Sequence, residues 1–158
     1  MNLGFYVNTT SDTPLNRDIY NLLNEAVEGG VVDDASLFYN EIDYNPMEKK
    51  FGTFNSTDLW SFNGTLVVTT LNSVPLANKV VNKIKLIYLY TRSEMEKGNI
   101  GHLMEMINLS KNTAIMTSSE EDKKEFYRLT KVNIPVISKF TAEEILKVKH
   151  EWFWEADN

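Results

Sequence analysis

The sequence alternates short apolar runs with longer segments in which apolar residues recur at helical spacing, and this alternation limits the folds open to the chain. Strands that alternate with helices of this length form βαβ units, whose crossovers are right-handed and whose sheets are mainly parallel. The predicted strands lie at residues 2–7, 33–40, 49–54, 65–69, 84–89, 113–118 and 134–138, and the predicted helices at 15–26, 56–62, 76–81, 100–111, 119–131 and 141–152. We therefore expect an α/β fold: a single Rossmann-like domain over residues 1–158, with a mainly parallel sheet of about six to seven strands and helices on both faces.

Local signals mark several of these boundaries. Thr13 followed by Pro14 is typical of a helix N-cap and first turn, and Gly29 with Gly30 is expected to stop the same helix. Ser56 or Thr57 is expected to cap the short helix that follows the third strand. The weak strand at residues 49–54 is expected at a sheet edge.

Composition narrows the classes of partner. The formal charge of −6 argues against general nucleic-acid binding, because phosphate contacts need clustered Lys and Arg. The chain has no cysteine, which excludes disulfides and thiolate zinc sites and fits a reducing compartment. No apolar run approaches the roughly 18 residues of a membrane helix. We expect a cytoplasmic protein with no membrane association.

The fold class also predicts where a ligand would bind. In open α/β sheets the binding crevice lies outside the carboxyl ends of the strands, where the strand order reverses. A Rossmann-like order places this reversal between the first strand and the strand at 65–69, so that the loops at 8–13 and 70–75 face each other. The ligand-binding candidates are polar residues in such loops: Asn8, Thr9, Thr10, Asn72, Ser73, Arg92 and Ser118.

The usual cofactor motifs are missing. No G-x-G-x-x-G or G-x-x-x-x-G-K-[ST] follows any strand, so we expect no dinucleotide or Walker-type nucleotide cofactor. Gly98 and Gly101 form either a simple turn into a helix or, with Lys97 or Arg92, an anion-binding helix start. His102 and His150 lie far apart, and no metal site is expected.

Two residues are candidates for a general base. His102 lies at a predicted helix start on the crevice side, and its alternative role is that of a solvated or core histidine. Asp12 lies in the first loop, and its alternative role is to favour the dipole of the helix that follows.

The C-terminal aromatic residues Trp152, Phe153 and Trp154 are expected to pack back onto the domain. Their alternative role is to anchor a partner or a second copy of the chain.

Four segments together resemble a known family: "MNLGFYV" with its polar loop, "LVVTTLNSVP", "IKLIYLYTRSE" and "NTAIMTSSEEDKKEFYRL". Over nearly its full length the chain resembles the N-terminal Rossmann-like domain of GT-B glycosyltransferases, and among these the phage DNA glucosyltransferases of the T-even type. In that family the nucleotide-sugar donor is held mainly by a C-terminal domain, and the N-terminal domain mostly contacts the acceptor. The donor-binding domain, with its sugar and diphosphate contacts, is expected to be absent here.

The resemblance implies two functions. The first is a binding or accessory protein without a complete active site. The second is a glycosyltransferase that acts in a complex or a dimer. The implied partners are a nucleotide-sugar or a sugar acceptor, together with a protein partner or a homodimer.

Overall fold

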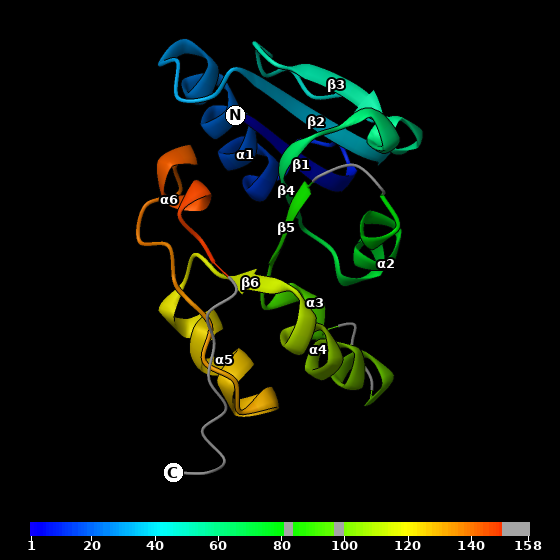
Figure 1. Ribbon diagram of the computed structural model, residues 1–158, viewed down its shortest axis with the longest axis vertical. Helices are drawn as coiled ribbons and strands as arrows, with labels where there is room; N and C mark the ends of the chain where they lie inside the picture. The colour runs from blue at the N-terminus through cyan, green and yellow to red at the C-terminus, as the bar shows by residue number, and fades with distance from the viewer. Residues whose placement is uncertain (81–83, 97–99, 150–158) are drawn as a thin grey trace.

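The computed structural model describes residues 1–80, 84–96 and 100–149, and its strands form one six-stranded parallel sheet. The strand order is β3-β2-β1-β4-β5-β6, which is the doubly wound order of Rossmann-like folds (Figure 1). The strands are β1 (Asn2–Thr9), β2 (Asp34–Glu41), β3 (Gly52–Asn55), β4 (Gly64–Val68), β5 (Ile84–Leu89) and β6 (Ala114–Met116). The expected α/β fold, with its mainly parallel sheet, is confirmed.

The connections contain the helices α1 (Pro14–Glu28), α2 (Val74–Asn78), α3 (Ser93–Glu96), α4 (Ile100–Asn112), α5 (Glu120–Thr130) and α6 (Ala142–Leu146), and the 3₁₀ helices η1 (Ser56–Ser61) and η2 (Leu71–Ser73). Local sequence sets several helix starts. Thr13 caps α1, because its side chain accepts a hydrogen bond from the Asn16 amide, as predicted. Ser119 and Thr141 cap α5 and α6 in the same way.

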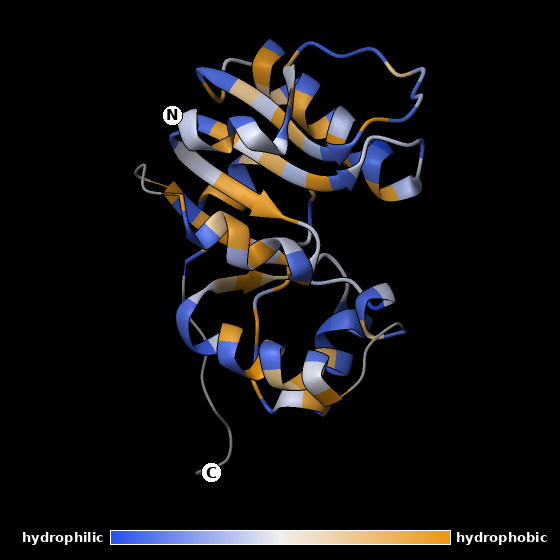
Figure 2. Ribbon diagram, turned by 90° about the vertical axis from the view of Figure 1, so that its right-hand side faces the viewer, coloured by the Kyte–Doolittle hydropathy of each residue, from blue (hydrophilic) through white to orange (hydrophobic). Residues whose placement is uncertain are grey.

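The core consists of two layers, one on each face of the sheet. Side chains alternate along a strand, so Leu3, Phe5 and Val7 of β1 face one layer and Tyr6 faces the other. The first layer is completed by α1 and α6, and the second by η1, α2, α4 and α5. Figure 2 shows the hydrophobic colour concentrated along the strands, whereas the helices carry it in stripes. Helices therefore cover both faces of the sheet.

Four predicted elements differ from the structure. Residues 134–138 form no strand: Val136 makes only an isolated parallel bridge to Thr117, and Pro135 has no amide hydrogen to donate to a ladder. The helix predicted at 76–81 begins earlier, as η2 and then α2. The 56–62 segment is a 3₁₀ helix capped by Asn55, not by Ser56 or Thr57.

The last helix is also shorter than predicted. α6 ends at Leu146, where the Lys85 ammonium binds the Leu146 carbonyl oxygen at 3.2 Å. The prediction for Trp152, Phe153 and Trp154 lies outside the described residues, and so do those for Lys97, Gly98 and His150.

Gly64 is the glycine on which the central strands depend most. It opens β4 at φ 129°, and a Cβ placed there would lie 2.4 Å from the Asn2 carbonyl oxygen of β1. Neither the backbone angle nor the contact tolerates a side chain.

We expect Gly64→Ala to lower the free energy of unfolding by about 3 kcal/mol, combining a left-handed backbone penalty with a backbone clash. Gly30→Ala is the control: Gly30 also has positive φ, at 68°, but nothing lies within 4 Å of its Cβ position. Gly30→Ala should lower the free energy of unfolding by only about 1 kcal/mol. Urea denaturation of both variants measures the difference, and equal losses would contradict the role of the β1–β4 contact.

Candidate functional site

A cavity of about 210 Å³ lies at the carboxyl ends of β1, β4 and β5, at the point where the strand order reverses. We call it the switch-point crevice. Eleven of the described residues line it: Val7, Asn8, Thr9, Thr13, Leu15, Asn16, Thr69, Thr70, Thr91, Ser93 and Glu94. Hydroxyl and amide groups predominate, and Glu94 is the one ionisable side chain in this lining.

Glu94 joins two strands across the crevice. Its Oε1 accepts a hydrogen bond of 2.6 Å from the Leu71 amide, at the start of η2, and one of 2.9 Å from the Tyr88 hydroxyl. Burial, and then the charge and hydrogen bond of Glu94, raise the pKa of Tyr88 well above its ordinary value. The carboxylate therefore occupies the backbone amide that follows β4.

The loop after β1 is shaped by its own hydrogen bonds. The buried Asn16 side chain donates through Nδ2 to the carbonyl oxygens of Thr9 at 2.9 Å and Ser11 at 2.7 Å. These bonds hold the loop against the first turn of α1, leaving the Thr9 and Thr13 side chains on the cavity wall.

Thr10 belongs to a different part of the structure. Its hydroxyl donates to the Asp43 carbonyl oxygen at 2.6 Å and accepts from the Asp43 amide at 2.7 Å, and its own carbonyl oxygen accepts from the Asn45 side chain. Thr10 is buried and fastens the loop after β2, so it does not line the crevice.

The other candidates fall into three groups. Asn8 and Thr9 line the cavity. Ser73 is buried, with its hydroxyl 2.7 Å from that of Thr70, and does not reach the wall. Asn72 and Ser118 are exposed outside the cavity.

The charged candidates are held by ion pairs or lie elsewhere. Arg17 binds Asp12 through two hydrogen bonds, of 2.7 and 3.1 Å, and lowers the pKa of this carboxyl, which makes Asp12 a weaker base. Arg92 turns toward the start of α5, where it pairs with Glu121 at 3.2 Å and Asp122 at 3.5 Å. His102 lies half-buried in the first turn of α4 and does not line the crevice.

The sequence analysis placed the loops at 8–13 and 70–75 at this edge, but of the wall residues it named only Asn8 and Thr9 as ligand-binding candidates, and it gave no role to Glu94. A signal was present: Thr69 and Thr70 directly follow β4, Thr91 follows β5 after one residue, and Asn8 and Thr9 are the last two residues of β1. The partner of Glu94 lies 23 positions away, at Leu71, and no local pattern indicates that pairing.

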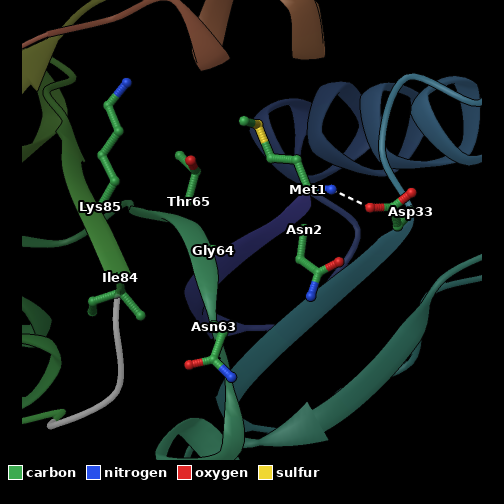
Figure 3. Close-up of a pocket in the computed structure, with 8 residues that line it drawn as sticks. All are labelled: Met1, Asn2, Asp33, Asn63, Gly64, Thr65, Ile84 and Lys85. Carbon is green, nitrogen blue, oxygen red and sulfur yellow. Dashed lines mark hydrogen bonds and ion pairs between the residues drawn. The ribbon is translucent and has the colours of Figure 1, made fainter.

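A larger hollow of about 820 Å³ lies at the opposite edge, where the strands begin (Figure 3). The Met1 amino group pairs with Asp33 on one side of it, and Lys85 stands on the other. Burial and the charge of Lys149 lower the pKa of Lys85. Because the ligands of parallel α/β sheets bind at the carboxyl edge, we assign the candidate site to the smaller cavity.

No family model, curated protein or solved structure matches this chain. In the described part of the chain, no three His, Cys, Asp or Glu side chains form a group suited to a metal ion. None of the described helices is long and apolar enough to cross a bilayer.

We expect Glu94→Ala to lower the free energy of unfolding by about 2 kcal/mol, because the Leu71 amide and the buried Tyr88 hydroxyl lose a charged acceptor. Glu94→Gln should lower the free energy of unfolding by less than half as much, since its amide oxygen can accept both hydrogen bonds. Glu96→Ala, on the exposed side of the same short helix, is the control and should change stability little. Urea denaturation compares the three, and a Glu94→Ala value no larger than the control would show that the bonds contribute nothing.

A second prediction concerns Tyr90, which is buried against Phe126 and whose hydroxyl has no partner among the described residues. Burial, together with the charges of Glu125 and Asp122, raises the pKa of Tyr90 from 10.0 to about 12. The folded protein therefore keeps this proton to higher pH than the unfolded chain does, and stability falls as the pH rises from about 10 to 12.

Tyr90→Phe should remove this alkaline loss of stability, which amounts to about 1 kcal/mol at pH 11. At neutral pH the variant should be as stable as the unmodified protein or slightly more stable. Denaturation midpoints at pH 8 and pH 11 test it. The control is Tyr44→Phe, whose ring is 80% exposed. An unchanged alkaline loss in Tyr90→Phe would assign the effect to other groups.

Proposed function

We propose that this chain is a binding or accessory protein that holds a small, hydroxyl-rich ligand such as a sugar in the switch-point crevice, without a complete active site. This is the role of the acceptor-binding half of the GT-B glycosyltransferases that the sequence resembles. The observation that carries the proposal is the chemistry of the crevice wall.

The wall suits an uncharged ligand with many hydroxyl groups. The side chains of Asn8, Thr9, Thr70 and Ser93 offer both donors and acceptors. Val7 and Leu15 add an apolar surface for the carbon skeleton. The volume of about 210 Å³ lies below the roughly 300 to 1,000 Å³ of sites for drug-sized ligands, and suits one sugar ring.

The same wall disfavours a diphosphate. None of the described Lys or Arg side chains lines the crevice, and the Leu71 amide is already bound by Glu94. A phosphate placed there would meet a fixed negative charge instead of a positive one. The geometry therefore favours a sugar acceptor over a nucleotide-sugar as the ligand.

The alternative function is glycosyl transfer in a complex or a dimer, with the crevice as the acceptor side. Neither Asp12 nor His102 lines the crevice, and Asp12 is paired with Arg17. In this alternative a partner supplies the donor site and, for an inverting reaction, the base.

Calorimetric titration of the purified chain with glucose, galactose and mannose, and separately with UDP and UDP-glucose, tests the proposal. We expect weak binding of at least one saccharide and no measurable binding of either nucleotide. Asn8→Ala should weaken saccharide binding about fivefold, by removing a side-chain hydrogen bond. Asn72→Ala, in the facing loop but outside the cavity, is the control.

Tighter binding of UDP-glucose than of any saccharide would contradict the proposal. Sugar transfer by the purified chain alone would replace it with the enzymatic alternative.

A further inference from the structure

We propose that the ligand of the switch-point crevice carries a protonated amine as well as hydroxyl groups, and that the Glu94 carboxylate recognises this amine. The inference rests on the proposed function, since it names the chemical class of the ligand that the same crevice holds. The class is an amino sugar or a small amino polyol.

The two carboxylate oxygens of Glu94 differ in their hydrogen bonds. Both hydrogen bonds to Glu94, from the Leu71 amide and the Tyr88 hydroxyl, fall on Oε1. No described residue donates to Oε2. A carboxylate accepts through both oxygens, so Glu94 is held in place by one of them, and within the described ranges the other is open to a donor from a ligand.

The charge of the described crevice wall comes from Glu94. Glu94 is the one ionisable side chain among the described residues that line the crevice. The arginines of the flanking loops are matched to other acids, Arg17 to Asp12 and Arg92 to Glu121 and Asp122. Within the described ranges, then, no cationic side chain reaches the cavity to balance Glu94.

A carboxylate in this position favours a cationic donor over a neutral one. A neutral hydroxyl that donates to Oε2 gains a hydrogen bond, whereas an ammonium gains a charge-assisted bond and a Coulomb attraction across a short distance. The remaining wall, with Asn8, Thr9, Thr70 and Ser93, is suited to hydroxyl groups. Glu94 and this wall together favour a ligand that carries one ammonium group on a hydroxylated ring or chain.

The experiment compares three hexoses, glucose, galactose and mannose, with their 2-amino derivatives, in calorimetric titrations at a pH below the pKa of the amines. We expect at least one amino sugar to bind about tenfold or more tightly than its parent hexose. Glu94→Gln should abolish this preference, because its amide oxygen keeps the bonds to Leu71 and Tyr88 while its NH2 group presents a donor without negative charge to the ligand.

Glu96→Gln is the matched control, because it removes the same charge from an exposed position of the same helix, outside the crevice. It should keep the preference, which separates recognition at Glu94 from a general change in net charge. Thermal midpoints of both variants show whether the fold is kept.

Equal affinities for hexoses and amino sugars in the unmodified protein, or a preference that survives Glu94→Gln, would overturn this inference and leave the proposed function standing. Absence of binding by all six sugars would overturn both.

Discussion

The whole structure depends on β1 lying between two parallel neighbours. β1 pairs with β2 through residues 2–9 and with β4 through residues 3–6, and its residues from Leu3 to Val7 are buried. The chain passes from β1 to β2 and β3 on one side, and then to β4, β5 and β6 on the other side of β1, so the strand order reverses beside β1 and helices cover both faces of the sheet. The crevice is a geometric result of that reversal, before any side chain is chosen. The close approach of Gly64 to Asn2 shows how tightly the β1–β4 seam is built.

Side chains then decide what the crevice can hold. In a dinucleotide-binding sheet, glycines let the backbone approach a phosphate and the helix amides bind it. Here Glu94 reaches across from the start of α3 and binds the Leu71 amide itself. This carboxylate adds a negative charge to a wall that threonines, a serine and asparagines otherwise keep polar. The same bond ties the end of β5 to the turn after β4, so Glu94 both lines the crevice and links two strand ends.

The sequence predicts best those features whose cause is local. The helix after β1 was predictable because its cap, its proline and its apolar spacing lie within one segment, and all three are seen in α1. The pair of Asp12 with Arg17 is equally local, five positions apart, but the sequence analysis considered Asp12 only as a base or as a group favouring the helix dipole. The strand predicted at 134–138 was wrong because apolar content alone does not supply a partner: residues 134–138 reach β6 only at the bridge of Val136 to Thr117. Glu94 was missed because its role arises only when β4 and β5 lie side by side.

Cavity size alone points to the opposite edge of this sheet. The hollow at the amino edge has about four times the volume of the crevice, 820 against 210 Å³, but two of its charged groups are already paired at its rim, Met1 with Asp33 and Lys85 with the Leu146 carbonyl oxygen. The crevice is smaller, but hydroxyl groups from three strand ends converge on it, together with a carboxylate whose Oε2 has no donor among the described residues. Specific recognition needs convergent donors and acceptors in fixed positions more than it needs volume. This criterion supports the carboxyl edge as the place of the ligand that we propose.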